Sequence, residues 1–156
     1  MNTLIFMIIL PIVYLIPFEI MTYLIHKHVM HGFGWVWHRS HHESPGGGLD
    51  KNDLYSIVFS VIAVILFYLS TVFFDSKWLL SIAIGLTLYG FLYFLVHDFL
   101  IHRRIPNKFY RTLKNQYIKS LIRAHAIHHN VKTKKGAQAF GFLYAPERYR
   151  YPKSKL

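Results

Sequence analysis

The chain reads TLIFMIILPIVYLIPFEIMTYLI from residue 3 to residue 25. This apolar stretch is long enough to cross a hydrocarbon layer of about 30 Å as a helix that rises about 1.5 Å per residue. It has no basic segment before it and no small-residue cleavage site after it, so we expect a retained helix and not a signal peptide. Pro11 and Pro17 are expected to kink this helix.

Two further apolar stretches follow, at residues 54–74 and 78–96, and only Asp75, Ser76 and Lys77 separate them. They are predicted to be antiparallel spans joined by a tight turn. The chain is 53% hydrophobic, which exceeds what a small soluble core requires. The sequence therefore predicts an all-α fold, an integral membrane helical bundle with three transmembrane helices, as a single membrane-embedded domain over residues 1–156.

The remaining segments are predicted to form a histidine-rich cap on this bundle. Residues 107–130 place apolar and basic side chains with helical spacing, which predicts an amphipathic helix. That helix either lies on the membrane surface or packs on the other cytosolic segments. Residues 44–53, SPGGGLDKND, are predicted to be a flexible connector. Residues 140–146, FGFLYAP, either fold back as a lid or dock on the membrane.

The distribution of charge predicts the orientation. Of the 18 lysines and arginines, only Lys77 lies in the turn between the second and third spans. The positive-inside rule therefore places this turn and the N-terminus outside, and the C-terminus in the cytosol. The formal net charge of +11 does not indicate a nucleic-acid partner, because long uncharged apolar stretches accompany it. The absence of cysteine excludes thiolate-bound metal centres, so any metal must be held by imidazole and oxygen.

All 11 histidines lie at the predicted cytosolic ends of the spans or just beyond them. The triplets HRSHH at 38–42 and HAIHH at 125–129 share one spacing, and on a helix it directs three imidazoles toward one point. Two H-x4-H pairs accompany them, with members about 140° apart at about 100° per residue. One ion takes about four to six ligands. The pattern therefore predicts two metal ions in a shared cage formed by His26, His31, His38, His41, His42, His97, His102, His125, His128 and His129.

The alternative role for these histidines is contact with lipid headgroups, and His28 is expected to lie outside the cage. Neutral imidazoles suit iron, zinc, copper or nickel. Two metal ions beside an apolar bundle favour oxygen chemistry on an apolar substrate, because a hydrocarbon offers no leaving group for hydrolysis.

Three carboxylates lie close to the histidines in sequence. Glu19 precedes His26 by two turns on the same face, and we expect it to bond one of the metal-binding imidazoles, since an unpaired carboxylate in a span is costly. Asp53 and Asp98 are candidates for the same supporting role. The alternative for each is a helix cap or a salt bridge to a nearby arginine.

Four stretches of the sequence resemble a known family. The residues that carry the resemblance are HKHVMHGFGWVWHRSHHESPGGGLDKNDLYSIVFS (26–60), YGFLYFLVHDFLIHRR (89–104), RAHAIHH (123–129) and FGFLYAP (140–146). These stretches resemble the bacterial beta-carotene 3-hydroxylases of the fatty acid hydroxylase and sterol desaturase superfamily, and the resemblance covers nearly the whole chain.

The resemblance implies a membrane-bound non-haem di-iron mono-oxygenase with the ten histidines as iron ligands. Such an enzyme takes a carotenoid substrate from the bilayer and hydroxylates C3 of the beta-ionone rings of beta-carotene, giving cryptoxanthin and then zeaxanthin. It uses O2 and electrons from an external reduced ferredoxin, which its own reductase supplies. The expected location is the inner, cytoplasmic membrane, as a multi-pass protein with its active site facing the cytosol.

Three positions depart from the family pattern. His28 stands where the family has tyrosine or another residue that does not bind metal, Phe99 replaces a common glycine, and Ile105 replaces a common tryptophan. The alternatives to a beta-carotene hydroxylase are a carotenoid ketolase, a sterol or fatty-acid hydroxylase or desaturase, and a non-enzymatic membrane metal-binding protein. Product analysis separates them.

Overall fold

The computed structural model describes residues 3–43, 48–106 and 114–150, and within these ranges the regular structure is entirely helical. Three helices are long and apolar enough to span a membrane: Ile5–Met30, Asp53–Phe73 and Lys77–Ile101. Few of their side chains are buried, as expected for helices whose solvent is lipid. The predicted all-α bundle of three spans is confirmed.

The first span is built from four consecutive helical segments. They are the π-helix η1 (Ile5–Ile9), α1 (Leu10–Val13), α2 (Leu15–Leu24) and the π-helix η2 (Ile25–Met30). The helix divides at Tyr14, three residues before Pro17, which has no N–H to bond the carbonyl of the preceding turn. The span packs on α5 (Lys77–Tyr93) at Gly85, where a Cβ would lie 3.1 Å from Tyr14 Cβ. A glycine here lets the two backbones approach closely.

The second and third spans form an antiparallel pair. The second consists of α4 (Asp53–Tyr68) and the π-helix η3 (Leu69–Phe73), and the third of α5 and the π-helix η4 (Phe94–Ile101). Ser76 starts α5 by accepting a hydrogen bond from Leu79 N–H. The third span continues five residues beyond the predicted end at Val96, because η4 carries the helix through His97.

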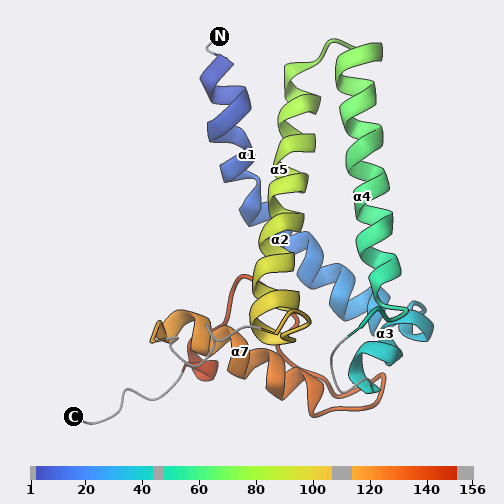
Figure 1. Cartoon of the computed structure of the whole chain (residues 1–156), viewed down its shortest axis with the longest axis vertical. Coiled ribbons are helices and arrows are strands. Elements are labelled where there is room, and N and C mark those ends of the chain that lie inside the picture. The colour runs from blue at the N-terminus through green and yellow to red at the C-terminus, as the bar shows by residue number, and fades with distance from the viewer. Residues whose placement is uncertain (1–2, 44–47, 107–113, 151–156) are drawn as a thin grey trace.

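Two helices outside the spans lie at the same end of the bundle, which we call the histidine end (Figure 1). They are α3 (Trp35–Glu43) and α7 (Gln116–His129). The N-terminus and the turn between α4 and α5 lie at the opposite end. A short 3-10 helix, η5 (Glu147–Tyr149), follows near the end of the described chain.

The amphipathic helix α7 is shorter than predicted. Asn115 caps it by accepting from Tyr117 N–H and Ile118 N–H, so the helix begins at Gln116. The predicted part at 107–113 lies outside the described residues, as do residues 44–47 of the predicted connector. The apolar face of α7 buries Leu121 and Ala124 against the C-terminal segment and Val96 of the third span, so packing on other segments is the alternative that the contacts favour.

Candidate metal centre

Ten histidines from four helical segments meet at the histidine end. His26 and His31 come from the end of the first span, and His97 and His102 from the end of the third. The triplets come from α3 and α7. Five of the seven largest fully buried side chains in the described chain are histidines, namely His26, His38, His42, His97 and His128. Apolar side chains normally fill such positions, so the burial of these imidazoles indicates that they bind a partner inside the protein.

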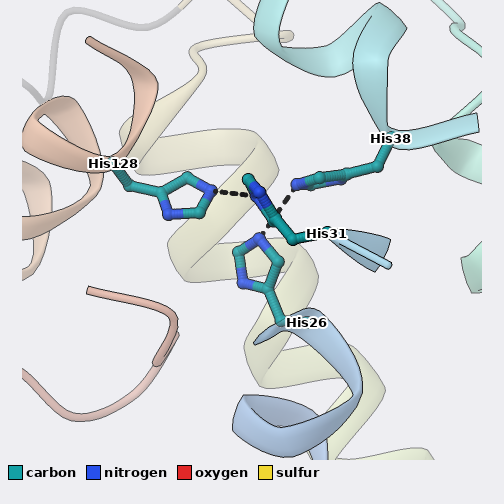
Figure 2. A group of neighbouring side chains, drawn as sticks. All are labelled: His26, His31, His38 and His128. Atoms are coloured by element: carbon teal, nitrogen blue, oxygen red, sulfur yellow. Dashed lines mark hydrogen bonds between the residues drawn. The ribbon is translucent and has the colours of Figure 1, made fainter. Parts of the chain in front are cut away.

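The imidazoles separate into two groups. In group one, His26, His31, His38 and His128 each place a ring nitrogen within 4.8 Å of one from every other member. Figure 2 shows these four rings pointing toward a common centre. In group two, His41, His97, His102 and His125 meet the same criterion.

The two remaining imidazoles adjoin one group each. The Nε2 atom of His42 lies 3.1 Å from that of His38, and the Nε2 atom of His129 lies 3.0 Å from that of His41. The rings of His42 and His129 also stack on each other, with centroids 4.7 Å apart. Each group thus has five imidazoles, and the two groups are neighbours.

Each H-x-x-H-H triplet is divided between the groups. From α3, His38 and His42 turn to group one and His41 to group two; from α7, His128 turns to group one and His125 and His129 to group two. The expectation that a triplet converges on one point was therefore wrong. The first and last imidazoles of a triplet lie almost one above the other on a helix, whereas the middle one is rotated away from the first.

The H-x4-H pairs are aligned by π-helical turns, which the sequence interpretation did not anticipate. His31 N–H donates to the carbonyl of His26, and His102 N–H to that of His97, each bond joining residues five apart. A turn closed at the fifth residue places its first and last side chains on the same side of the helix. The ring centroids of His97 and His102 consequently lie 4.5 Å apart.

Oxygen acceptors fix the tautomer of all five imidazoles in group one, His42 included. The Nδ1–H groups of His26, His31, His42 and His128 donate to backbone carbonyls of Phe140, Lys134, Val131 and Gln138. The Nδ1–H of His38 donates to Asn52 Oδ1 at 2.7 Å. A neutral imidazole carries a single ring N–H, so every Nε2 of this group presents only a lone pair.

These lone pairs face each other at short range. The Nε2 atoms of His26 and His38 are 3.0 Å apart, and those of His31 and His128 are 3.2 Å apart. No proton is available to join them. Nitrogen ligands at right angles on a first-row metal ion, each about 2.1 Å from it, lie about 3.0 Å from one another. The donor set and its spacing therefore fit a metal ion in each group.

Burial keeps these imidazoles neutral. It lowers the pKa of His38 and His102 to about 3, of His42 to about 4 and of His128 to about 2. Burial also lowers the pKa of His31, His41, His125 and His129. Neighbouring imidazoles lower it further in all of these except His31. Neutral imidazoles have the free lone pairs that metal binding requires.

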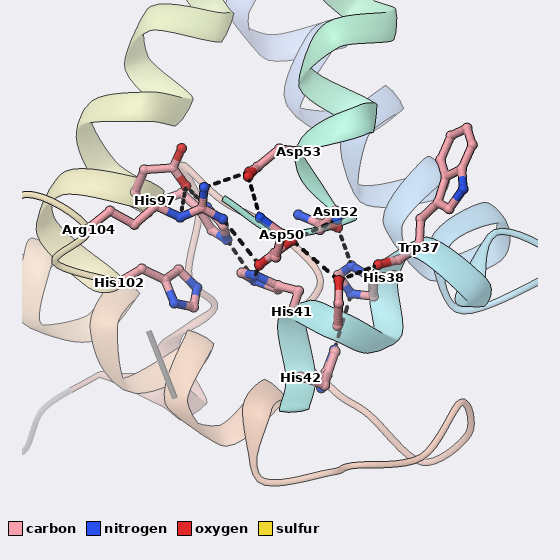
Figure 3. A network of polar contacts seen from close by, with 12 residues as sticks. Trp37, His38, His41, His42, Asp50, Asn52, Asp53, His97, His102 and Arg104 are labelled. Atoms are coloured by element: carbon pink, nitrogen blue, oxygen red, sulfur yellow. Dashed lines mark hydrogen bonds and ion pairs between the residues drawn. The ribbon is translucent and has the colours of Figure 1, made fainter. Parts of the chain in front are cut away.

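Carboxylates support group two. The Nδ1–H of His97 donates to Asp98 Oδ1 at 2.7 Å, and the Nδ1 of His41 lies 3.8 Å from Asp50 Oδ2. Arg104 joins three carboxylates, with distances of 2.6 Å to Asp53, 3.3 Å to Asp50 and 3.8 Å to Asp98 (Figure 3). Asp98 therefore contacts a histidine directly, whereas Asp53 has the alternative role, a salt bridge to an arginine.

Glu19 has different partners from those we expected. Its Oε1 accepts hydrogen bonds from the N–H groups of Phe142, Leu143 and Tyr144, and its Oε2 accepts one from the Tyr89 hydroxyl. None of the described histidines donates to it. The reason is that the C-terminal segment folds back beside α2 and presents three successive N–H groups to this carboxylate.

The segment at 140–146 thus covers the histidines, as in the lid alternative. The Phe142 ring stacks on His26 with centroids 5.0 Å apart, and the Phe140 ring meets His26, His31 and His128 edge to face. His28 is exposed and belongs to neither group.

Sequence reasoning missed Asn52, Asp50 and Arg104. Asp50 and Asn52 lie in the polar run DKND that precedes the second span, and Arg104 lies two residues after His102. Polar residues so close to a histidine-rich span end were the available signal.

Comparison with known proteins agrees with this geometry. A beta-carotene hydroxylase of Pantoea ananas is 46% identical over 142 residues, covering 90% of this chain and 75% of that protein. One from Paracoccus sp. (strain PC1) is 43% identical over 82% of this chain and 77% of its own length. A chloroplastic beta-carotene 3-hydroxylase 2 of Arabidopsis thaliana is 32% identical over 78% of this chain and 40% of its own length.

No solved structure matches the chain. Among protein families, residues 11–145 match the fatty acid hydroxylases. This match, together with the bacterial relatives, confirms the resemblance that the histidine-rich stretches indicated, and the chain belongs to the fatty acid hydroxylase family.

Proposed function

We propose that this chain is a non-haem di-iron mono-oxygenase that hydroxylates C3 of the beta-ionone rings of beta-carotene, giving cryptoxanthin and then zeaxanthin. The observation that carries the proposal is the pair of five-imidazole groups at one end of three apolar spans. The beta-carotene hydroxylases among its relatives support the choice of substrate. The proposal treats residues 1–156 as one functional domain.

The ten histidines would hold two iron ions through the nitrogens that face the centre of each group. Bound iron would supply the activation of O2, so that one oxygen atom enters a C–H bond and the other leaves as water. The residues of the chain prepare the site for this chemistry. The carbonyls of Phe140, Lys134, Val131 and Gln138 keep Nδ1 protonated and Nε2 free, and Asp98 does the same for His97.

Aromatic side chains would exclude water from the centre. Phe140 and Phe142 are buried against the histidine rings, and Tyr93 stacks on His97 with centroids 4.5 Å apart. A hydrocarbon substrate would arrive through the lipid, where the exposed faces of the spans are apolar. A dry and rigid site of this kind favours insertion of oxygen into an apolar bond.

We further propose that the protein lies in the cytoplasmic membrane with its histidine end in the cytosol. The positive-inside rule supports this orientation, because only Lys77 of the 18 basic side chains lies in the turn at the other end. Reduced ferredoxin, recharged by its reductase, would supply electrons, and the basic histidine end would attract an acidic donor. Turnover should then fall as salt concentration rises.

The test is expression in a cell that accumulates beta-carotene, followed by chromatography of its pigments. We expect cryptoxanthin and zeaxanthin, and we expect His41→Ala to abolish both at equal protein level, because His41 belongs to group two. Ketone products would indicate a ketolase. An unchanged pigment pattern would overturn the proposal and redirect the search to sterols and fatty acids.

A further inference from the structure

Glu19 fastens a distant part of the chain to the interior of the first span. Its Oε1 lies 2.9 Å from Phe142 N, 3.0 Å from Leu143 N and 3.1 Å from Tyr144 N. Its Oε2 lies 2.7 Å from the hydroxyl of Tyr89 on α5. Hydrogen bonds to a carboxylate are about twice as strong as those between neutral groups. Four of them make this junction a strong one, and they explain why a carboxylate is tolerated within a span.

The local backbone is shaped for this junction. A Cβ at Gly141 would lie 2.9 Å from Glu19 Oε1 and 2.8 Å from the carbonyl oxygen of Tyr144. Only glycine leaves room for the chain to turn its N–H groups onto the carboxylate at this point. Gly141 thus lies in close contact with Glu19, and the two residues beside it in the sequence, Phe140 and Phe142, are both phenylalanines.

The junction holds Phe142 against both histidine groups. The Phe142 ring centroid lies 5.0 Å from that of His26 in group one and 5.2 Å from that of His97 in group two. It also lies 4.9 Å from the ring of Tyr93, which is four residues deeper in the third span than His97. Phe142 is 3% exposed. One ring thus closes the centre on the side where the first and third spans enter it.

A substrate dissolved in the bilayer must approach the centre from this side, because His26 and His97 are the members that lie within the spans. The end of such a molecule would meet Phe142 and Tyr93 before it reached the imidazoles. The rings of Phe142 and Tyr93 meet edge to face at this side of the centre, and these apolar rings suit a hydrocarbon end group.

We propose that Phe142 is the specificity-determining residue against which the end of the apolar substrate is placed, and that Glu19 is the positioning residue that holds Phe142 there. This inference rests on the proposed function. The bulk of the Phe142 ring sets how far the end group advances, and so which of its carbons stands next to the metals. A smaller side chain at position 142 lets the end group of the substrate advance further, so that a neighbouring carbon of that end group is oxidised.

The first experiment compares Phe142→Leu with the unaltered chain in a beta-carotene-accumulating cell. Mass spectrometry and chromatography give the ratio of products oxidised at different ring carbons, and elemental analysis gives iron per purified chain. A displacement of about 1 Å at a reacting centre changes rates by about a hundredfold. We therefore expect the share of minor ring isomers to rise about tenfold, with iron content unchanged.

Matched variants separate this role from general damage. Phe91→Leu makes the same change at a phenylalanine that is 57% exposed on α5, and it should leave the product ratio unchanged. Phe142→Met keeps a large apolar side chain and folds under milder strain, and the product ratio should shift in the same direction as with leucine.

The role of Glu19 is tested by comparing the product ratios of the single variants with that of the double variant of Glu19 and Phe142. Glu19→Ala should shift the product ratio as Phe142→Leu does, and the double variant should shift it no further than Phe142→Leu alone, since both changes act on one ring. Tyr89→Phe removes a single donor and should give a smaller shift. Glu19→Gln keeps an acceptor for the three N–H groups and should restore most of the original ratio.

Two results would overturn the proposal. One is an unchanged product ratio in both Phe142 variants. The other is loss of iron or of folding in those variants while the remaining activity keeps the original ratio, because Phe142 would then be only a structural cover. Failure of the proposed function looks different, since the unaltered chain and Phe91→Leu would then also yield no hydroxylated carotenoid.

Discussion

His38 donates its Nδ1–H to Asn52 Oδ1 at 2.7 Å, and this bond ties α3 to the residue that precedes α4. Both residues are buried, His38 at 1% exposure and Asn52 at 4%. His38 is the one member of group one whose tautomer depends on a side chain, because a backbone carbonyl serves each of the others.

Asn52→Ala is therefore expected to weaken metal binding. The change leaves the Nδ1–H of His38 buried without an acceptor, which costs about 1–3 kcal/mol. Loss of such a supporting partner typically lowers metal affinity about 10–100-fold. Titration of the purified protein against a chelator of known affinity measures this. Asn52→Asp keeps an acceptor and should retain most of the affinity, and Asn130→Ala, at an exposed position, should retain all of it. Equal affinity in Asn52→Ala would contradict the assignment.

The separation of the imidazoles into two groups predicts separate metal losses. His128→Ala removes a member of group one, and His125→Ala removes a member of group two. Each variant should lose about one of two bound ions, because a group short of one imidazole binds more weakly while the other group keeps its donors. Metal per chain is measured by elemental analysis. His28→Ala is the matched control, since this exposed histidine lies on η2 outside both groups. Simultaneous loss of both ions in either variant would show a single inseparable centre.

The three spans could be predicted from the sequence because apolarity over a sufficient length is a local property. The tight turn at Asp75, Ser76 and Lys77 followed from the same pattern. To predict that the histidines lie at one end of the bundle, only the span boundaries and the direction of the chain were required. These features depend on neighbouring residues, and the structure agrees with them except that Lys77 is the first residue of α5 and not part of the turn.

The internal order of the site could not be predicted in the same way. The carbonyls that orient four histidines belong to Val131, Lys134, Gln138 and Phe140, and every residue type carries a carbonyl. The π-helical turns are likewise invisible to a periodicity that assumes the α-helix. Glu19 was recognised as a costly carboxylate, but its partners are N–H groups 123 to 125 positions away in the chain. Contacts of this kind require the folded chain.

The contacts of Arg104 predict a loss of stability when its charge is removed. The side chain is 15% exposed and lies between Asp50, Asp53 and Asp98. Arg104→Gln leaves these carboxylates facing each other, and because the pairs are only partly buried the cost should lie between about 1 kcal/mol for an exposed pair and about 3–5 kcal/mol for a fully buried one. We expect a clearly lower unfolding temperature in detergent and weaker metal binding by group two. Arg39→Gln breaks an exposed pair with Glu43 and should change stability by at most about 1 kcal/mol. Similar unfolding temperatures for the two variants would refute this role.

The neutral imidazoles predict that the metal-free protein is destabilised by acid. In the folded chain burial lowers the pKa of His38 to about 3 and of His42 to about 4, against 6.5 for an unperturbed histidine. Between these values the unfolded chain binds protons that the folded chain does not, so the free energy of unfolding falls as pH decreases from 6.5 toward 4. Above pH 7 neither state binds these protons, and stability should be level.

Thermal unfolding of the metal-free protein in detergent, from pH 8 to pH 4.5, measures this dependence. The unfolding temperature should stay constant down to about pH 7 and then fall steadily, because several buried histidines titrate together in the unfolded chain. Bound metal should delay the fall until protons displace it from the imidazoles. An unfolding temperature that stays constant or rises on acidification would mean that the imidazoles take up protons in the folded chain as readily as in the unfolded chain, and this would contradict their burial as neutral groups.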